Sequence, residues 1–260
     1  MAENNVILQV QDVTMQFGGL RAIDNVSFHV DESEIFGLIG PNGAGKTTLF
    51  NVITANYKPT SGSVTLAGTS LKGLKPNQVV NAGIARTFQN IRLFDNLTVE
   101  DNVKLGLHNH INYGMWSGIF RLPNYWKEEK VAHERAMELL SIFDMGYLAK
   151  YKAGSLPYGA QRRLEIVRAL ATNPSLLLLD EPAAGMNPSE TAELMENIVK
   201  IRDTFGIAIL LIEHDMNLVM GICEGIAVLN FGQIIAKGTP DEIKNDPVVI
   251  EAYLGKQKEA

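Results

Sequence analysis

The sequence has little of several features that would place it in other classes of protein. Its single cysteine, Cys223, excludes a disulfide within the chain and is typical of a reducing compartment. Its uninterrupted apolar runs, such as residues 207–212, fall far short of the roughly 18 residues that indicate a membrane-spanning helix. The first ten residues, MAENNVILQV, contain neither the basic start nor the apolar core of a secretory signal peptide.

Positive charge is also scarce. Lys and Arg number 23 against 29 Asp and Glu, the net charge is −6, and no run of basic residues stands out. A nucleic-acid partner is not indicated, because proteins that neutralise phosphates cluster Lys and Arg. The 260 residues are 46% hydrophobic and 20% charged, which is ordinary for one large domain or two lobes that share a core. We expect a soluble chain whose role at a membrane, if any, comes through a partner protein.

What the sequence does contain is a glycine-rich loop, GPNGAGKTT, at residues 40–48. It fits the pattern Gly, four residues, Gly, Lys and then Ser or Thr, and it lies between an apolar run at 35–39 and an expected helix at 47–56. Glycines let the backbone wrap round phosphate oxygens, and the amide N–H groups and helix N-terminus offer partial positive charge. Lys46 should reach the β- and γ-phosphates, and the Thr47 hydroxyl should bind Mg²⁺.

A glycine-rich turn with an exposed lysine is the plain alternative for this loop. The apolar strand expected before it and the helix expected after it favour phosphate binding instead. The sequence therefore predicts a chain that binds a nucleoside triphosphate.

The order of expected elements predicts an α/β fold: a P-loop core with a mixed sheet and flanking helices, an antiparallel β subdomain and an inserted α-helical subdomain. Strands are expected at residues 6–13, 25–30, 35–39, 62–68, 83–88, 175–179 and 207–212, with a hairpin at 226–229 and 233–237. Helices are expected at 47–56, 131–143, 161–171 and 188–204, with two short ones in 240–254.

These elements group into one nucleotide-binding domain over residues 1–260. Its core is expected at 1–90 and 171–240, the helical subdomain at about 91–170, and a helical tail at 241–260. The aromatic segment 108–126 is expected to be a loop packed on the helical lobe, and a partner-contact surface is the less favoured alternative.

A second apolar strand ends in two carboxylates. Four leucines at 176–179 precede Asp180 and Glu181, and a buried strand would bring both acids to the sheet edge where ligands bind. Alone, this pattern could be a buried strand that ends in solvated acids. Beside a P-loop, we expect Asp180 to hold hydrated Mg²⁺ and Glu181 to orient and polarise the attacking water.

Three further residues have both a structural and a functional interpretation. Gln89, between the core and the helical insertion, is a polar loop residue or a sensor of the γ-phosphate or metal. His214 follows the expected strand 207–212 and is a structural histidine or a donor to the γ-phosphate. Phe17 precedes a Gly-Gly turn and packs in the core or, if exposed, stacks on adenine.

Residues 156–166, LPYGAQRRLEI, begin an expected helix whose N-terminal amides form a second anion site. Because a lobe intervenes, one chain cannot easily bring this site to its own P-loop nucleotide, whereas a second copy could.

These motifs, in this order and approximate spacing, resemble those of ATP-binding-cassette ATPases over nearly the whole chain. The segments RTFQNIRLFDNLTVEDNV, LPYGAQRRLEIVRAL, DEPAAGMNPSET, LLIEHDMNLVM and GTPDEIKNDPVVIEAYLG are further similar to the larger of the two ATPase subunits of branched-chain amino acid importers. The resemblance implies ATP hydrolysis that powers import, with ATP and Mg²⁺ as cofactors. It also implies a nucleotide-sandwich heterodimer with a second ATPase subunit, docked on two integral-membrane permease subunits at the cytoplasmic face of the inner membrane and fed by an extracytoplasmic solute-binding protein.

Motifs and resemblance together assign the site. The catalytic residues are Lys46, Gln89, Glu181 and His214, and the Mg²⁺ ligands are Thr47, Gln89 and Asp180. The ATP-binding residues are Phe17, Gly40, Pro41, Asn42, Gly43, Ala44, Gly45, Lys46, Thr47 and Thr48, with Gly159 and Gln161 acting across the dimer.

The chain departs from the usual Leu-Ser-Gly-Gly-Gln signature of these ATPases. Pro157 replaces the serine, Tyr158 the first glycine and Ala160 the glutamine, so the serine hydroxyl that would contact the γ-phosphate across the dimer is missing. Gly159 and the helix N-terminus remain. Asn187 stands where many relatives have aspartate.

Other functions stay open from sequence. A soluble cassette ATPase of translation or DNA repair usually has two fused cassettes or a coiled-coil insertion, and neither is found. A nucleotide-binding structural subunit with little turnover conflicts with the presence of both Glu181 and His214. Within transport, urea import and lipopolysaccharide export are the nearest rivals, since the solute does not touch this subunit.

Overall fold

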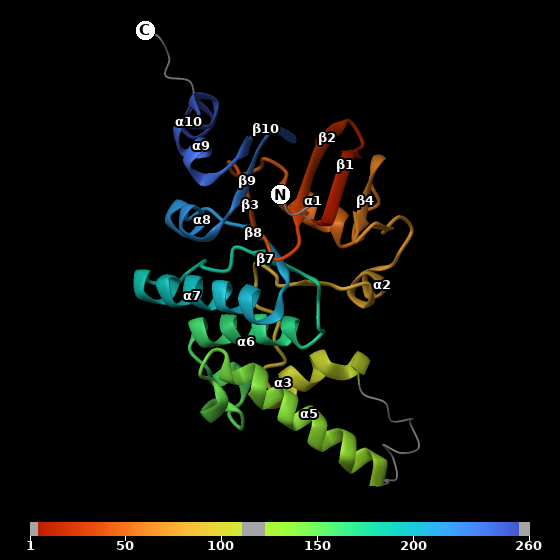
Figure 1. The fold of residues 1–260 in the computed structure, drawn as a ribbon, viewed down its shortest axis with the longest axis vertical. Coiled ribbons are helices and arrows are strands. Elements are labelled where there is room, and N and C mark those ends of the chain that lie inside the picture. The colour runs from red at the N-terminus through yellow and green to blue at the C-terminus, as the bar shows by residue number, and fades with distance from the viewer. Residues whose placement is uncertain (1–4, 111–122, 255–260) are drawn as a thin grey trace. The chain divides into compact units, whose positions relative to one another are not determined.

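The computed structural model of the chain describes residues 5–110 and 123–254 (Figure 1). Most of the aromatic segment 108–126, for which we expected a packed loop, lies outside the described residues. Contacts within the chain divide it into two compact units. The first unit comprises Met1–Arg86 and Ser175–Ala260, and the second comprises Thr87–Pro174.

The first unit contains an antiparallel sheet with the strand order β2-β1-β4-β5. Alternating burial along its long strands shows one face turned to the core, as period-2 patterning requires. The two strands expected at 6–13 and 25–30 are confirmed and are longer than predicted, because the Gly18–Gly19 turn joins them directly. The strands are β1 (Val6–Phe17), β2 (Leu20–Asp31), β4 (Ser61–Leu66) and β5 (Thr69–Ser70).

The second sheet of the first unit is mixed, with the order β10-β9-β3-β8-β7-β6. Only β10 runs antiparallel to its neighbour, and every residue of β3, β7 and β8 is buried. Strands covered on both faces are apolar throughout, which explains the short continuous runs in the sequence. The strands are β3 (Ile35–Ile39), β6 (Ile84–Arg86), β7 (Leu176–Asp180), β8 (Ala208–Ile212), β9 (Gly225–Asn230) and β10 (Gln233–Gly238).

The hydrophobic core of the first unit joins the two sheets and helix α1. Leu8 and Phe28 from the antiparallel sheet belong to the same buried cluster as Phe50 of α1 and Leu210 and Leu229 of the mixed sheet. The rings of Phe28 and Phe36 stack with centroids 5.6 Å apart. This shared core fixes the P-loop, which connects β3 to α1.

Helices flank the mixed sheet, and their ends follow local capping chemistry. Asn187 caps α7 in a reciprocal capping box with Glu190, and Gly206, with φ of 61°, ends it. The helix α8 was not expected; Asp215 caps it by accepting from two backbone N–H groups. In Figure 1, α9 and α10, drawn in blue, lie next to β10. The helices of this unit are α1 (Lys46–Ile53), α2 (Pro76–Asn81), α7 (Pro188–Phe205), α8 (Met216–Ile222), α9 (Pro240–Asn245) and α10 (Pro247–Leu254).

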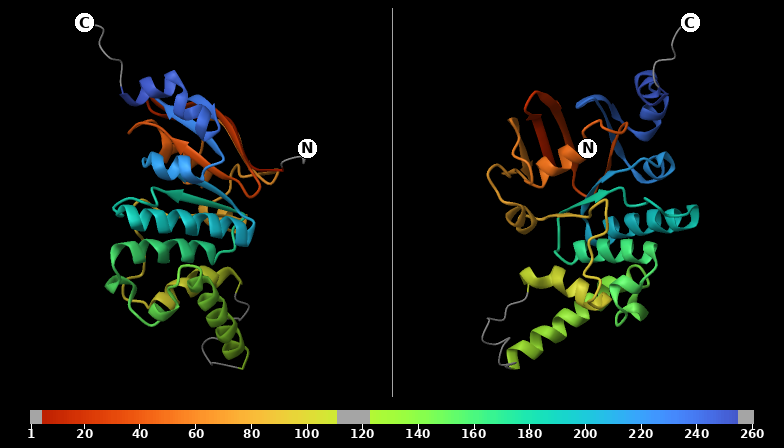
Figure 2. Two further views of the ribbon diagram at one scale, coloured as in Figure 1. Left: turned by 60° about the vertical axis from the view of Figure 1, so that its left-hand side comes forward. Right: turned by 180° about the vertical axis from the view of Figure 1, so that it is seen from behind.

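The second unit is helical where the structure describes it, as Figure 2 shows. Helices α5 and α6 begin earlier than the expected 131 and 161, whereas α3 and the three short 3₁₀ turns were not predicted. Gly106 of α3 meets α6 so closely that a Cβ would overlap the Arg168 carbonyl oxygen. The elements are α3 (Val99–Gly106), η1 (Leu107–His110), α5 (Pro123–Ser141), η2 (Gly146–Leu148), η3 (Ala153–Ser155) and α6 (Tyr158–Leu170).

No helix within residues 5–110 and 123–254 combines the length and the apolar character that a membrane crossing demands.

Candidate nucleotide site

The strand order brings three of the predicted motifs to one edge of the mixed sheet. The P-loop follows β3, His214 follows β8, and Asp180 ends β7. These strands are neighbours and parallel, with Leu38 opposite Ile212 and Ile212 opposite Asp180. Their carboxyl ends therefore lie together, which is where open α/β sheets bind ligands.

The P-loop needs glycine at two positions for steric reasons. Gly40 has a φ of 146°, and a Cβ there would overlap the Leu229 carbonyl oxygen; Gly45 has a φ of 108° and lies against Ala22. Gly45 is also the N-cap of α1 and makes no side-chain cap hydrogen bond. The first amides of α1 are thus left to a ligand, and a helix N-terminus attracts anions.

Lys46 is buried, with 6% of its surface exposed, and is held by the loop that it follows. Its ammonium donates to the carbonyl oxygens of Gly40 at 2.6 Å and Pro41 at 3.0 Å. Burial lowers the pKa of Lys46, while the charges of Glu181 and Asp180 act in the opposite direction. The two carboxylates thus favour the charged form of Lys46, and the two carbonyl contacts hold its ammonium group against the P-loop backbone.

Asp180 is tied to a residue that the sequence did not single out. Arg86, at the end of β6, donates from Nη2 to Asp180 Oδ2 at 2.7 Å, and the two side chains are 8% and 4% exposed. Arg86 Nη1 donates to Asn51 Oδ1 of α1, also at 2.7 Å, and the guanidinium lies over the Phe50 ring. The ion pair therefore connects the end of β7 to the helix that follows the P-loop.

The oxygen donors at this edge suit Mg²⁺. The Asp180 carboxylate and the Thr47 hydroxyl are hard ligands, and Mg²⁺ is normally held by one or two carboxylates together with substrate phosphates. Within the described residues no group of three or more His, Cys, Asp and Glu side chains is placed to hold a metal.

Glu181 and His214 are in direct contact. His214 Nε2 lies 2.7 Å from Glu181 Oε1, and the side chains are 41% and 18% exposed. Because a carboxylate only accepts hydrogen bonds, this contact requires a proton on Nε2. Glu181 also has a φ of 49°, which is uncommon outside glycine and strained for a long side chain.

Glu213, between β8 and His214, is another acid that the sequence reading passed over. It is 3% exposed and accepts hydrogen bonds from the backbone N–H groups of Ala183 at 2.8 Å, His214 at 2.9 Å and Asp215 at 3.4 Å. Burial raises the pKa of Glu213, these hydrogen bonds act to lower it, and the charge of Glu181 raises it.

Phe17 lies at the end of β1, and 43% of its surface is exposed. Tyr57 meets it edge to face, with ring centroids 5.3 Å apart and planes at 80°. The Tyr57 ring thus packs against Phe17. The exposed part of the Phe17 ring is a flat apolar surface of the kind that stacks on a base.

Gln89, Gly159 and Gln161 belong to the second unit. Gln89 is exposed and lies three residues beyond the end of β6, which stops at Arg86 rather than at the expected Phe88. Gly159 is buried in the first turn of α6. The Gln161 side chain donates to the Leu156 carbonyl oxygen at 2.8 Å, so it helps to shape the turn before the helix.

Two buried charges of α6 hold the loop that contains Gln89. Glu165 Oε1 accepts from the N–H groups of Phe88 at 3.4 Å and Arg92 at 3.3 Å, and Arg162 donates to the Phe88 carbonyl oxygen. Arg162 and Glu165 pair at 2.7 Å with 0% and 1% exposure. Hydrogen bonds from this buried ion pair of α6 therefore join the Gln89 loop to the helix of the altered signature.

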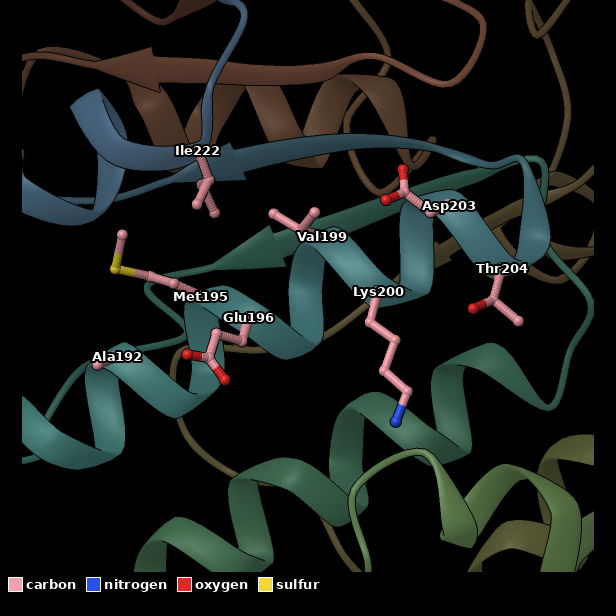
Figure 3. Close-up of a pocket in the computed structure, with 8 residues that line it drawn as sticks. All are labelled: Ala192, Met195, Glu196, Val199, Lys200, Asp203, Thr204 and Ile222. Atoms are coloured by element: carbon pink, nitrogen blue, oxygen red, sulfur yellow. The ribbon is translucent and has the colours of Figure 1, made fainter.

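A groove of about 660 Å³ lies on the first unit, away from these residues (Figure 3). Ile222 of α8 lines it together with residues of α7, among them Met195, Val199 and Lys200. A second cavity, of about 480 Å³, is bordered by Tyr57 and by β4 residues. Neither cavity is lined by the P-loop or by the loops after β7 and β8.

Comparison with known proteins agrees with this architecture. The family described as "ABC transporter" matches residues 23–184, and "Branched-chain amino acid ATP-binding cassette transporter" matches residues 233–259. A crystal structure of a nucleotide-free ATP-binding cassette from an ABC transporter superimposes with a TM-score of 0.83 at 34% identity, covering 96% of this chain and all of that one. A cassette in its ADP conformation gives a TM-score of 0.84 at 32% identity, with 96% and 99% covered.

The curated relatives are similar over nearly their whole length. The chain is 46% identical over 249 residues to the high-affinity branched-chain amino acid transport ATP-binding protein BraF of Pseudomonas aeruginosa, covering 96% of this chain and 98% of that protein. It is 49% identical to LivG of Salmonella typhimurium and 47% identical to LivG of Escherichia coli, with the same coverage.

The chain therefore belongs to the ABC transporter family, as its motifs predicted. The predicted α/β fold class, with an antiparallel β subdomain and a helical insertion, is confirmed as that of an ATP-binding cassette. Within the family, the relatives just described are named as ATP-binding proteins of branched-chain amino acid transport.

Sequence reasoning missed Arg86, Glu213 and the Arg162–Glu165 pair. The available signal was a charge inside or directly beside an apolar run, since buried charges are rarely tolerated without a partner. That signal marks Arg86 after Ile84 and Ala85, and Glu213 after Ile212.

Proposed function

We propose that this chain is the ATP-hydrolysing subunit of a transporter that imports branched-chain amino acids. The observation that carries the proposal is the convergence of the P-loop, Asp180 and the Glu181–His214 contact at one sheet edge. The choice of solute is supported by the relatives' names and by the match of residues 233–259.

In this proposal, the P-loop amides and Lys46 bind the ATP phosphates, and Phe17 stacks on adenine. Asp180 and Thr47, with Gln89, would hold Mg²⁺, and the ion would supply positive charge to the phosphates. Glu181 orients the attacking water and accepts its proton while the bond between the γ-phosphorus and the ADP oxygen breaks. His214 fixes the Glu181 carboxylate, since a charge-assisted hydrogen bond restricts its orientation.

The proposal also includes the partners. A second ATPase subunit would face this one, with Gly159 and Gln161 acting on the nucleotide of the other subunit. Two integral-membrane permease subunits would hold the pair at the cytoplasmic face of the cell membrane, and an extracytoplasmic solute-binding protein would deliver the solute. The supporting observation is that the exposed Gln89 loop is fastened to the signature helix, so a partner that touches the loop also acts on that helix.

Lys46→Ala tests the phosphate site in the purified chain. A hydrogen bond to a charged group is worth about 1.5–3 kcal/mol, so ATP binding should weaken by roughly 10- to 150-fold and hydrolysis should be lost. The measurements are ATP binding by calorimetry and phosphate release. Lys130→Ala, which changes a lysine that is 77% exposed, is the control and should behave as wild type. Hydrolysis by Lys46→Ala close to the wild-type rate would refute the site.

A further inference from the structure

Glu213 is a buried carboxylate that the proposed chemistry does not use. Its side chain is 3% exposed, and it occupies the first position after β8, directly before His214. Placing a carboxylate out of water is costly unless hydrogen bonds compensate it, so its contacts should explain why an acid is there.

Its two oxygens connect two separate loops. Oε1 accepts from the N–H of Ala183 in the loop after β7, and Oε2 accepts from the N–H of His214 in the loop after β8. Ala183 is two positions after Glu181, and His214 is the histidine that contacts Glu181. The carboxylate thus bridges the segments that carry the two side chains in contact at 2.7 Å.

The segment after β7 needs such a restraint. Glu181 has a φ of 49°, in the left-handed region, and conformations of this kind are energetically unfavourable for residues other than glycine. They persist only where surrounding contacts over-determine them. The backbone contacts of Glu181 are its N–H to Ile212 at 2.9 Å and its carbonyl oxygen to the N–H of Ala184 at 3.2 Å; Glu213 adds the restraint on Ala183.

We propose that Glu213 is a positioning residue for hydrolysis: its carboxylate holds the loops after β7 and β8 together so that Glu181 stays strained and in contact with His214. This inference rests on the proposed function, because it assigns a role within the same site. In this role Glu213 acts through the backbones of the two loops, from whose N–H groups it accepts hydrogen bonds.

A carboxylate can accept a hydrogen bond from the N–H of Ala183 and another from the N–H of His214. Ionised, it accepts at both oxygens, whereas glutamine has one acceptor oxygen and an NH₂ group that faces an N–H in the other loop. Glu213→Gln therefore keeps the shape, retains one bridge and breaks the other.

The first experiment compares ATP hydrolysis by wild type and Glu213→Gln. Small misplacements of catalytic groups can cost about 100-fold, so kcat should fall roughly 10- to 100-fold while KM for ATP stays within about threefold, because the P-loop is unchanged. Glu196→Gln, an exposed glutamate on α7, is the matched control and should keep the wild-type kcat. A kcat for Glu213→Gln within threefold of wild type would overturn the inference.

A double-mutant cycle with His214→Ala separates positioning from simple stabilisation. If Glu213 acts through the Glu181–His214 contact, Glu213→Gln should change kcat less than threefold in the His214→Ala background. An equal fold-loss in both backgrounds would instead indicate a structural role and overturn the inference. Amide hydrogen exchange gives a second readout: residues 181–184 and 213–216 should exchange faster in Glu213→Gln than in wild type, and unchanged exchange would contradict the bridge.

These measurements also distinguish failure of the inference from failure of the proposed function. A wild-type chain that does not hydrolyse ATP, even in its assembled complex, would sink the function, while the exchange rates would still report whether the bridge exists. An active wild type with an equally active Glu213→Gln would sink only the role of Glu213.

Discussion

Among single residues, the contact between Glu181 and His214 is central to the proposed chemistry. Glu181 has a φ of 49°, its carboxylate lies 2.7 Å from His214 Nε2, and two residues further on the N–H of Ala183 donates to Glu213. Lys46 is a buried cation at the same edge of the sheet. Burial lowers the pKa of Lys46, and the charges of Glu181 and Asp180 act to raise it. In the proposed mechanism the negative charge of Glu181 would act on the water, and the same charge favours the charged form of Lys46.

Glu181→Gln should separate nucleotide binding from hydrolysis. Glutamine keeps the size of the side chain but not the charge that polarises water, and loss of a general base typically costs about 10²–10⁴-fold in rate. ATP should still bind, and ATP that is not hydrolysed should hold two cassettes together. Size-exclusion chromatography with ATP should therefore show a dimer for Glu181→Gln.

Glu196→Gln serves as the control and should elute as wild type. A Glu181→Gln chain that remains monomeric at saturating ATP would count against the sandwich arrangement.

Individual site residues could be placed from sequence where a motif fixes their spacing. The P-loop, Asp180, Glu181 and His214 each follow an apolar run, and parallel strands bring their carboxyl ends together. Arg86 and Glu213 could not be assigned in this way, because their partners, Asp180 and Ala183, lie 94 and 30 positions away along the chain. Only the strand order makes them neighbours.

Among the helices, α6 contains the altered signature and also holds the Gln89 loop by hydrogen bonds. Arg162 and Glu165 stand one turn apart and grip the backbone on both sides of Gln89. Neither side chain is more than 1% exposed. A buried charge without a partner is strongly destabilising, so each of these two charges depends on the other. The Gln89 loop is therefore attached to α6 by these hydrogen bonds.

Removing one member of this pair should destabilise the second unit strongly. Glu165→Ala leaves the Arg162 charge buried and two N–H groups without their acceptor, and breaking a buried pair costs about 3–5 kcal/mol. Glu138→Ala is the control, since it breaks the exposed Arg135–Glu138 pair, which is worth at most about 1 kcal/mol. Urea denaturation should show the difference in midpoint, and equal midpoints would contradict the role given to the pair.

Elements with strong periodicity were predicted well and short ones were not. The fully buried strands β3, β7 and β8 match their predictions to within a residue or two. The helix α8 was missed because its seven residues span barely two turns, and Asp215 was the only clear starting signal. The strand β6 was predicted too long, since the Phe88 backbone is hydrogen-bonded by side chains of α6.

At the scale of the whole molecule, the chain alone supplies only part of the proposed machine. The altered signature at Pro157, Tyr158 and Ala160 lacks the serine hydroxyl, although α6 keeps its N-terminus. The family and fold class were predictable because they depend on many motifs along the chain. The solute was indicated only through the resemblance to branched-chain amino acid importers, because no residue of this subunit contacts the solute in the proposed mechanism.

The altered signature leads to a prediction about pairing. Two copies of this chain would present two identical signatures without the serine, whereas a second, different ATPase can supply a complementary surface. We expect the transporter, captured from membranes through a tag on this chain, to contain one copy of it and one copy of a shorter ATPase. Native mass spectrometry measures the ratio, and two copies of this chain with no second ATPase would contradict the prediction.

The most direct test of the account is uptake of labelled leucine, isoleucine and valine by cells that lack this chain, with urea uptake measured alongside. We expect amino acid uptake to be lost, urea uptake to be unaffected, and wild type but not Glu181→Gln to restore the loss. Intact amino acid uptake together with lost urea uptake would contradict the proposed solute and assign the chain to urea import.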